Sequence, residues 1–303
     1  MTHADATARV DIVIPTYNHA HFLGEALESV VAQTMTAWRA IIVNNFSTDH
    51  THDVVASFAD PRIVIVDFAN HGIIAASRNH GLSLATAPYV AFLDSDDTWY
   101  RDKLARCLAA LDAGADIVCH GERWTSTGGT HRDVAYGPER NARYARMLFR
   151  HNCVSTSAVV ARRELLTNVH GFDERPDFVT AEDYDLWLRL ARDGARYVFI
   201  PDILGEFRRH EASASSAVER NAAAELAVVD SHVAALPASL VSRLRHRHRR
   251  ARVAYAAARS HQERSHRRDA LRRYVECLNT SPFVLRAWVG LALLVMPTRI
   301  ARR

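Results

Sequence analysis

The first third of the chain alternates short apolar runs with segments of helical periodicity. Runs typical of buried strands occupy residues 10–14, 38–43, 63–68 and 88–93. Between them, apolar side chains recur at helical spacing over residues 22–33, 51–58 and 73–85. This repeated alternation predicts an α/β fold with a mostly parallel, doubly wound sheet.

After residue 98 the pattern is less regular. Strands are expected at residues 116–125, 131–136, 155–161 and 196–200. Helices are expected at residues 99–113, 139–150 and 181–192, and residues 207–210 are placed in a loop. From Val218 the chain is helical throughout and rich in Ala and Arg. These changes predict an α/β domain over residues 8–216 and a basic helical extension over residues 217–303.

An acidic cluster follows the strand expected at residues 88–93. Asp94, Asp96 and Asp97 then stand at the carboxyl end of a buried strand, the edge where open α/β sheets bind ligands. Carboxylates this close repel one another, and a cation relieves that repulsion. Oxygen ligands suit Mg²⁺ or Mn²⁺, typically shared with a substrate phosphate. On the acids alone, a turn that caps the next helix explains the cluster equally well.

Other strands of this half also end in polar residues, namely Thr16-Tyr17, Asn44-Asn45 and Asn70-His71. Because parallel strands end at one edge of the sheet, we expect these side chains to line one site. No G-x-G-x-x-G motif follows any of the strands. This argues against a dinucleotide dehydrogenase and against a P-loop enzyme.

Composition restricts the class of protein further. Hydrophobic residues make up 48% of the 303 residues and charged residues 24%, which excludes a disordered chain. The four cysteines form no C-x-x-C pair, which fits a reducing cytosol. The first nine residues lack the apolar core of a signal peptide, and Ala287–Met296 is about half the length that spans a bilayer. We therefore expect a cytoplasmic protein.

Charge is unevenly distributed along the chain. The net charge is +4, yet the residues from Val218 onward contain 17 Arg and only six Asp or Glu. Basic clusters flank the apolar segment Phe283–Ile300, which predicts peripheral contact with an anionic membrane. The helices are equally compatible with packing on the α/β domain or with a homodimer. Nucleic acid is not expected as a partner, because the basic stretches have few aromatic residues for stacking.

The motifs of the α/β domain resemble those of the family 2 glycosyltransferases, which have the GT-A fold and use nucleotide-diphosphate sugars. Six motifs occur in one order and cover roughly residues 8–215: Ile14-Pro15-Thr16-Tyr17-Asn18, Ala32-Gln33-Thr34, Ser47-Thr48-Asp49, Ala76-Ser77-Arg78-Asn79, Asp94-Ser95-Asp96-Asp97 and Glu182-Asp183-Tyr184-Asp185-Leu186-Trp187. Each motif alone is weak, whereas six in register are specific.

The resemblance implies a role for each motif. It places Asp183 as the general base, and Asp96 with His210 at a Mn²⁺ or Mg²⁺ ion. We also expect Glu182 and Trp99 on the acceptor side, and for Trp99 a position in the core is the alternative. The residues implied to bind the nucleotide sugar are Pro15, Thr16, Tyr17, Asn45, Arg78, Asp94 and Ser95. For Glu182 and Asp183 a simple capping role at the start of a helix is an alternative.

These roles are chemically consistent with inverting transfer to a hydroxyl of a glycan or lipid-linked saccharide. A sugar hydroxyl is a poor nucleophile at neutral pH, so a carboxylate must take its proton. A cation stabilises the charge of the departing diphosphate. A nucleotidyltransferase and a catalytically silent nucleotide-sugar-binding scaffold are the alternatives, and the amount of pyrophosphate released separates the first of these from a glycosyltransferase.

The sequence departs from the family pattern at Asn44-Asn45, where two acids are usual, and at Phe46, where a small residue is usual. Asn45 still accepts a hydrogen bond through its carbonyl oxygen, more weakly than a carboxylate, and it also donates. A UDP-sugar is the first expectation for the donor, and dTDP or GDP are alternatives.

Overall fold

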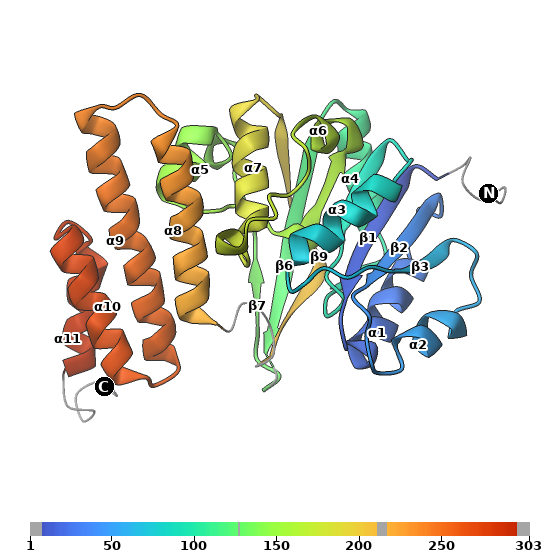
Figure 1. Ribbon diagram of the computed structural model, residues 1–303, viewed down its shortest axis with the longest axis horizontal. Coiled ribbons are helices and arrows are strands. Elements are labelled where there is room, and N and C mark those ends of the chain that lie inside the picture. Colours follow the sequence, from blue (N-terminus) through green and yellow to red (C-terminus); the bar gives the residue numbers. More distant parts are fainter. Residues whose placement is uncertain (1–7, 127, 211–216, 296–303) are drawn as a thin grey trace. The chain divides into compact units, whose positions relative to one another are not determined.

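The computed structural model describes residues 8–126, 128–210 and 217–295, which separate into two compact units (Figure 1). The first unit runs to Met147 and resumes at Asn152. The second unit consists of Leu148–His151 and the four C-terminal helices. The domain boundary predicted at residue 216 lies outside the described residues, and each unit is considered by itself below.

The first half of the first unit is a parallel sheet. Its strands are β1 (Val10–Thr16), β2 (Trp38–Asn44), β3 (Ile63–Asp67) and β4 (Tyr89–Phe92), in the order β3-β2-β1-β4. The connecting helices are α1 (Ala20–Val31), α2 (Thr51–Ser57) and α3 (Ile74–Leu84). Every residue of β1 and β4 is buried, which explains why these strands read as apolar runs rather than as alternating patterns.

The second half completes a mixed sheet. Its elements are β5 (Thr98–Trp99), α4 (Lys103–Asp112), β6 (Ile117–Ser126), β7 (His131–Val134), β8 (Val159–Arg162), α6 (Arg163–Asn168), α7 (Glu182–Arg192) and β9 (Tyr197–Arg209). The full strand order is β3-β2-β1-β4-β8-β6-β9-β5, and β7 pairs with β6. Strand β8 is antiparallel to both β4 and β6, whereas β9 is parallel to β6.

Two predicted element boundaries, one of a helix and one of a strand, were wrong for the same reason. Both depend on strand pairing between segments that are distant in the sequence. The helix expected from Trp99 begins at Lys103, because Thr98 and Trp99 pair with β9. Strand β9 continues to Arg209 instead of ending at Ile200, because it follows β6 past a register shift near Gly121. Residues 207–209 therefore belong to a strand and not to a loop.

Two further segments are interrupted. The helix expected at residues 139–150 divides into a 3₁₀ turn, Glu139–Asn141, and α5 (Tyr144–Arg150). Asn141 side-chain hydrogen bonds to Gly137 O and from Arg146 compete with a continuous helix. The strand expected at residues 155–161 begins as a 3₁₀ turn, Thr156–Ala158, and only then becomes β8. That turn proves important for the site.

A core of aliphatic and aromatic side chains fixes the parallel strands against their helices. It includes Ile12, Leu27, Trp38 and Leu104, all of which are essentially inaccessible to solvent. Helix α3 approaches β1 closely at Gly81, where any Cβ would overlap the Val13 side chain. This close approach sets the position of α3, the helix that carries Arg78.

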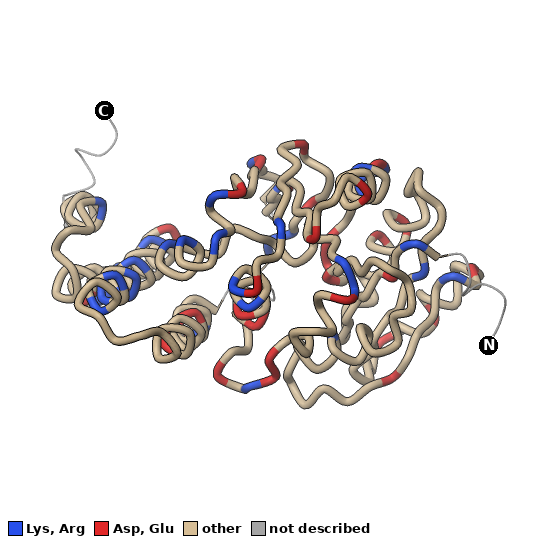
Figure 2. Tube along the Cα trace, turned by 90° about the horizontal axis from the view of Figure 1, so that it is seen from above, with Lys and Arg blue, Asp and Glu red and all other residues tan. Residues whose placement is uncertain are grey.

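The tail unit is a helical bundle of α8 (Val218–Ala234), α9 (Leu240–Glu263), α10 (Arg267–Thr280) and α11 (Leu285–Val295). Its core consists of small side chains around one aromatic ring, including Ala254, Ala258, Ala270 and Tyr274. Arginines recur along these helices (Figure 2). No helix in the described part of the chain is long and apolar enough to cross a membrane.

Candidate active site

The carboxyl ends of β1 and β2 meet as the sequence predicted. Thr16 pairs with Asn44 in register, and Asn45 N donates to Thr16 O at 3.0 Å. Pro15 and Thr16 are buried at the end of β1. Two aromatic side chains, in contrast, are exposed at this edge: Tyr17 by 54% and Phe46 by 58%. The edge therefore presents aromatic surface that suits the stacking of a flat ligand such as a nucleobase.

The two asparagines after β2 have different environments. Asn44 is fully buried and donates to Asp67 Oδ1 at 2.6 Å, so it joins the ends of β2 and β3. Asn45 is partly exposed, and its Oδ1 already accepts from Asn70 N at 2.9 Å. A carbonyl oxygen has a second lone pair, and the side-chain amide adds two donors. Asn45 thus offers a base both an acceptor and a donor.

The acids of the cluster do not share one environment. Asp94 Oδ1 accepts from Arg78 Nη2 at 2.7 Å, and Asp96 Oδ2 lies 3.0 Å from His210 Nε2. Asp97 is buried and accepts from Ser157 Oγ at 2.6 Å. Desolvation, followed by the neighbouring charge of Asp96, raises the pKa of Asp97 well above its usual range. Asp97 is therefore poorly suited to act as a charged carboxylate.

Arg78 joins the two acidic motifs, which are almost 90 residues apart in the sequence. Its guanidinium binds Asp94 from one nitrogen and Glu182 Oε1, at 2.6 Å, from the other. The Arg78 side chain is only 4% exposed, and the cost of burying it is offset by both acids. Glu182 also accepts from Thr180 N at 2.7 Å. Binding of the nucleotide sugar by Arg78 stays a prediction. The group left for such a contact is Nε, which is buried and has no hydrogen-bond partner among the described residues.

Asp183 lies directly beside this bridge, at the start of α7. Its Oδ1 accepts from Tyr184 N at 2.6 Å, and its Oδ2 accepts from Thr156 Oγ1 at 3.1 Å. Desolvation raises the pKa of Asp183 to about 6, the Glu182 charge adds to the rise, and Arg78 opposes it. A carboxylate with this pKa is ionised at neutral pH and is still basic enough to take a proton.

Asp96 and His210 fit a divalent metal ion. Asp96 Oδ2 and His210 Nε2 lie 3.0 Å apart, so a carboxylate oxygen and an imidazole nitrogen converge where one cation would be held by both. Phe22 stacks on the His210 ring with centroids 4.8 Å apart and so fixes its orientation. Ser95 is buried and its Oγ lies 2.9 Å from His19 Nδ1.

The residues predicted for the acceptor side are both buried. Glu182 is bound by Arg78 as described above. Trp99 donates from Nε1 to Ser157 O at 2.7 Å, and Lys103 Nζ lies 3.2 Å from the centroid of its ring. A direct contact of either side chain with an acceptor would require its exposure, and this role stays a prediction.

Several site residues were not identified from the sequence. Thr156 and Ser157 come from the 3₁₀ turn before β8 and bind Asp183 and Asp97, respectively. The polar run Ser155-Thr156-Ser157 inside an expected buried strand was the available signal. Glu122 on β6 is also buried, and its Oε2 accepts from Tyr136 Oη at 2.6 Å. Desolvation raises the pKa of Glu122 to about 7.

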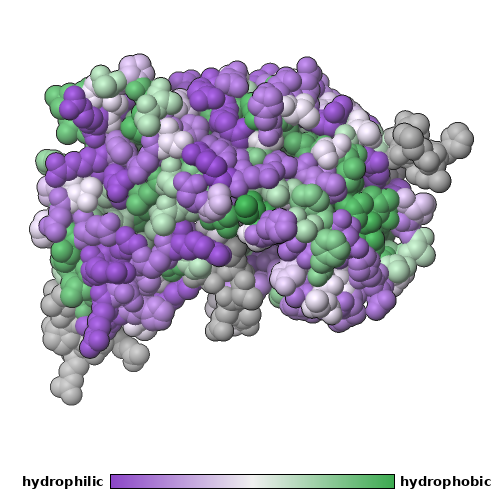
Figure 3. All heavy atoms as spheres, in the orientation of Figure 1, coloured by the Kyte–Doolittle hydropathy of each residue, from purple (hydrophilic) through white to green (hydrophobic). Residues whose placement is uncertain are grey.

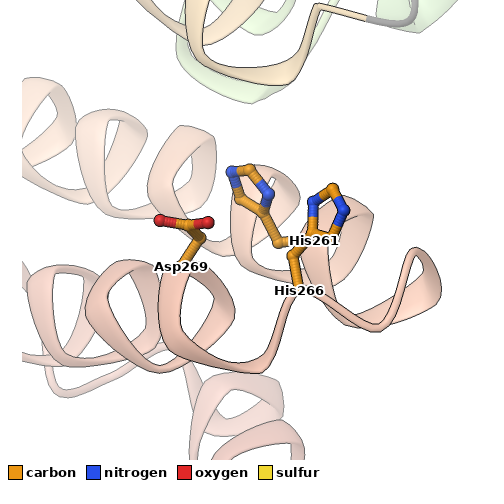
Figure 4. A group of neighbouring side chains, drawn as sticks. All are labelled: His261, His266 and Asp269. Carbon is orange, nitrogen blue, oxygen red and sulfur yellow. The ribbon is translucent and has the colours of Figure 1, made fainter.

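A second group of metal-binding residue types occurs in the tail unit. His261, His266 and Asp269 offer ligand atoms within 4.8 Å of one another (Figure 4). However, His261 Nε2 is 2.9 Å from Glu219 Oε1, and Asp269 Oδ1 is 3.6 Å from Arg272 Nη2. Positive charge beside the group opposes a cation. We therefore interpret it as part of the ionic packing between the tail helices.

The sequence and fold now define the class of the protein. Residues 11–167 match the family described as Glycosyl transferase family 2, and the chain belongs to this family. The UDP-Glc:alpha-D-GlcNAc-diphosphoundecaprenol beta-1,3-glucosyltransferase WfgD of Escherichia coli is 30% identical over 61% of this chain and 70% of its own. The amylovoran biosynthesis glycosyltransferase AmsB of Erwinia amylovora is 30% identical over 65% and 68%, respectively. The protein is a glycosyltransferase.

Solved structures show the same fold. TarS 1–349 of S. aureus, in complex with UDP-GlcNAc, aligns with a TM-score of 0.64 and 16% identity over 94% of this chain and 89% of that chain. The mannosyltransferase PcManGT of Pyrobaculum calidifontis, in complex with GDP-Man and Mn²⁺, aligns with a TM-score of 0.64 and 19% identity over 97% and 82%. The GT-A prediction is confirmed.

Proposed function

We propose that the protein transfers a sugar from a UDP-sugar to a hydroxyl of a lipid-linked saccharide, with inversion at the anomeric carbon and Asp183 as the general base. The observation that carries this proposal is the Arg78 bridge. It brings the Asp94–Asp97 cluster and the Glu182-Asp183 pair to one place. A site for the diphosphate and a base for the acceptor are thus held together.

The reaction then needs one displacement. The acceptor oxygen bonds to the anomeric carbon while the bond from that carbon to the diphosphate oxygen breaks. The acceptor proton passes to Asp183 Oδ2, and the nucleoside diphosphate leaves with the bonding electron pair. Thr156 and Tyr184 hold the carboxylate in place through their hydrogen bonds. Direct displacement by an acceptor that a single base activates leads to inversion.

Asp96 and His210 are the residues we assign to a divalent cation. When bound, the cation neutralises the charge that develops on the diphosphate. An imidazole ligand suits Mn²⁺ better than Mg²⁺, which prefers oxygen ligands. PcManGT, a structural neighbour, was solved with Mn²⁺. We therefore favour Mn²⁺ over Mg²⁺.

The donor and acceptor follow from the relatives together with the site. The name of WfgD specifies UDP-Glc as donor and a diphosphoundecaprenol-linked GlcNAc as acceptor, and TarS was solved with UDP-GlcNAc. The exposed rings of Tyr17 and Phe46 suit stacking against a base, and Asn45 suits hydrogen bonding to it. Together with the relatives, these features support uridine as the base.

A lipid-linked acceptor makes a membrane surface useful, and the tail unit has features that suit one. The inner face of α11 packs into the tail core through Ala287, Leu291 and Leu294. Its outer face is also apolar, with Leu285, Trp288, Val289 and Leu293 exposed. Arg286 is the exception on α11, and an apolar helix face of this kind is normally covered. Hydrophobic side chains are visible along the left margin of the molecule in Figure 3.

Basic and apolar residues meet at one end of the tail unit. Arg247 donates to Thr280 O and Asn279 O, so the first turns of α9 lie beside the α10–α11 connection. Leu240 and Leu244 are exposed on these turns, and Phe283 is 81% exposed on the connection. Arginines near an anionic membrane surface contribute about 1 kcal/mol each. We propose that this end binds anionic lipid. The predicted flanking residues Arg299, Arg302 and Arg303 lie outside the described residues.

The donor assignment is tested by thermal unfolding of the whole chain with UDP-glucose, UDP-GlcNAc and GDP-mannose, each with Mn²⁺ or EDTA. A ligand at 100 times its Kd stabilises the folded state by about 2.7 kcal/mol. That corresponds to a rise in Tm of several degrees for a protein of this size. We expect the rise with a UDP-sugar and Mn²⁺ only. An equal response to all three in EDTA would contradict the assignment.

A further inference from the structure

The first unit, which contains the candidate active site, is the catalytic unit. Two of its arginines lack the ion pairs with carboxylates that other arginines near the site form. Arg78, Arg123 and Arg208 each form an ion pair with a carboxylate. Arg132 on β7 and Arg209 at the end of β9 form no ion pair with any of the described residues. Both instead lie against one indole ring, with their guanidinium carbons 4.6 and 5.8 Å from the centroid of Trp124. Two uncompensated positive charges are therefore held at one place.

The ring that holds them is itself fixed. Trp124 Nε1 donates to Tyr136 Oη at 3.1 Å, and Tyr136 Oη donates to the buried Glu122. The indole also packs on Phe207, with ring centroids 5.2 Å apart. Stacking on a fixed aromatic ring restricts the arginine side chains before any ligand arrives. Less conformational entropy is then lost on binding.

These side chains surround a small polar cavity of about 140 Å³, lined by Trp124, Ser126, Thr130, His131, Arg132 and Arg209. Sites for whole drug-sized ligands measure roughly 300–1,000 Å³, so this cavity suits one group of a larger ligand. Its chemistry is that of an anion site, with two arginines, a histidine and two hydroxyl groups. Arginine pairs are well suited to phosphate oxygens because their N–H groups form bidentate hydrogen bonds.

Strand β9 connects this cavity to the acidic cluster. Arg209 stands between Arg208, whose N donates to Asp97 Oδ1 at 3.0 Å, and His210, which contacts Asp96. Because successive side chains of a strand point to opposite faces, the Arg209 side chain lies against Trp124, whereas His210 contacts Asp96 at the same end of β9. An acceptor could reach both the reaction centre and this cavity if its anionic group were attached close to the sugar whose hydroxyl accepts the transferred residue.

We infer that the cavity formed by Trp124, Arg132 and Arg209 binds the phosphate groups of the acceptor. The inference rests on the function proposed above and specifies the acceptor class: a saccharide joined to its lipid through a phosphate or diphosphate. The carboxylate of a uronic acid in the acceptor is the other anionic group that could bind here, so a glucuronide is one of the probes in the experiment. Neutral glycans lack the group that this cavity recognises.

The test is calorimetric titration of the full-length protein already saturated with UDP and Mn²⁺, so that the donor site is occupied. The probes are a short-chain alkyl α-GlcNAc-diphosphate, the alkyl GlcNAc glycoside without phosphate, and an alkyl glucuronide. We expect the diphosphate probe to bind at least tenfold more tightly than the other two. Equal affinity for the diphosphate and the neutral glycoside would overturn the inference, and tighter binding of the glucuronide would replace the phosphate with a carboxylate.

Variants identify the residues responsible. Arg132→Ala and Arg209→Ala should each lower the affinity for the diphosphate probe about tenfold. Arg132→Lys should have an intermediate affinity, because lysine keeps the charge but cannot form the bidentate hydrogen bonds. Arg101→Ala, which removes another exposed arginine of the same unit, is the matched control and should bind as the wild type does.

Binding of UDP with Mn²⁺ separates this inference from the proposed function. It should be unchanged in the Arg132 and Arg209 variants. If these variants bind the diphosphate probe normally, the inference is wrong even where UDP binding shows that the donor site is intact. If UDP does not bind the wild type at all, the proposed function fails, and titration of the probe without nucleotide still tests the cavity.

Discussion

Two carboxylates, one in each unit, have pKa values that are shifted in opposite directions. Burial and the neighbouring Glu182 raise the pKa of Asp183 to about 6. Hydrogen bonds from Arg273, and then from His261, lower the pKa of Glu219 to about 2. Asp183 is thus held in a state that favours accepting a proton, whereas Glu219 is a permanently charged centre of ion pairs on the tail surface.

The difference shows how each unit uses charge. In the catalytic unit the Arg78 side chain is only 4% exposed, and it has defined partners in Asp94 and Glu182. In the tail Arg249 is buried, but the central acid of the Glu219 ion pairs has a side chain that is 43% exposed. Buried charge fixes geometry for chemistry, while exposed charge is free to attract a charged partner.

The largest effect is expected from Asp96→Ala. Loss of this carboxylate removes one of two assigned protein ligands of the cation, and transfer should fall to background. Wild-type enzyme in EDTA should behave in the same way, and Mn²⁺ should restore the wild type only. The assay is release of nucleoside diphosphate from a UDP-sugar in the presence of acceptor. Full wild-type activity in EDTA would contradict the assignment of Asp96 and His210 to a divalent cation.

Asp183→Asn should lower turnover by roughly 10²–10⁴, the usual contribution of general base catalysis, with little change in donor affinity. Because the base must be ionised, kcat/KM of the wild type should rise with pH and level off above about 6. The variant should lose this rise. Asp193→Asn, at the exposed end of the same helix, is the control. A variant with nearly normal turnover would show that Asp183 merely caps α7.

Arg78→Met tests the value of the buried bridge for stability. Removing one partner of a buried ion pair costs about 3–5 kcal/mol, because Asp94 and Glu182 would remain without their cation. The matched change is Arg106→Met, which breaks the exposed pair with Asp202 and should cost about 0–1 kcal/mol. Urea unfolding of both variants measures the two values. Similar losses would mean that burial does not distinguish the two kinds of pair.

Phe283→Ser combined with Trp288→Ser tests the tail with the smallest expected effect. The full chain should pellet with vesicles that contain anionic lipid at low salt and less at high salt, and the variant should pellet severalfold less. Val64→Ser, at an exposed apolar position of the catalytic unit, is the control. If wild type and variant both stay in solution at every salt concentration, the proposal that this end of the tail unit binds anionic lipid is wrong. A change in oligomeric size would then indicate a homodimer.

Much of the fold could be predicted because the first strands are continuous apolar runs. β1 and β4 are buried on both faces, so their sequences identify them without knowledge of their neighbours. The second half of β9 could not be identified in this way. Its sequence includes Pro201, Asp202 and Gly205, and it is a strand only because β6 and β5 pair with it.

The same contrast applies to the site. The motifs that contain Asp96, Arg78 and Asp183 stand out in the sequence, and the structure brings Arg78 together with both acidic motifs. Thr156 and Ser157 were missed, because they reach the acids only through a 3₁₀ turn that precedes β8. The position of that turn depends on the antiparallel pairing of β8 with β4 and β6, which local sequence does not specify.

The most direct test of the proposed reaction is the anomeric configuration of its product. The full-length enzyme would be incubated with an α-linked UDP-sugar, Mn²⁺ and a short-chain alkyl diphosphate-linked GlcNAc, and the new linkage assigned by NMR. Displacement assisted by Asp183 predicts a β-linked product and stoichiometric UDP. An α-linked product would contradict inversion, and pyrophosphate in place of UDP would show nucleotidyl transfer instead.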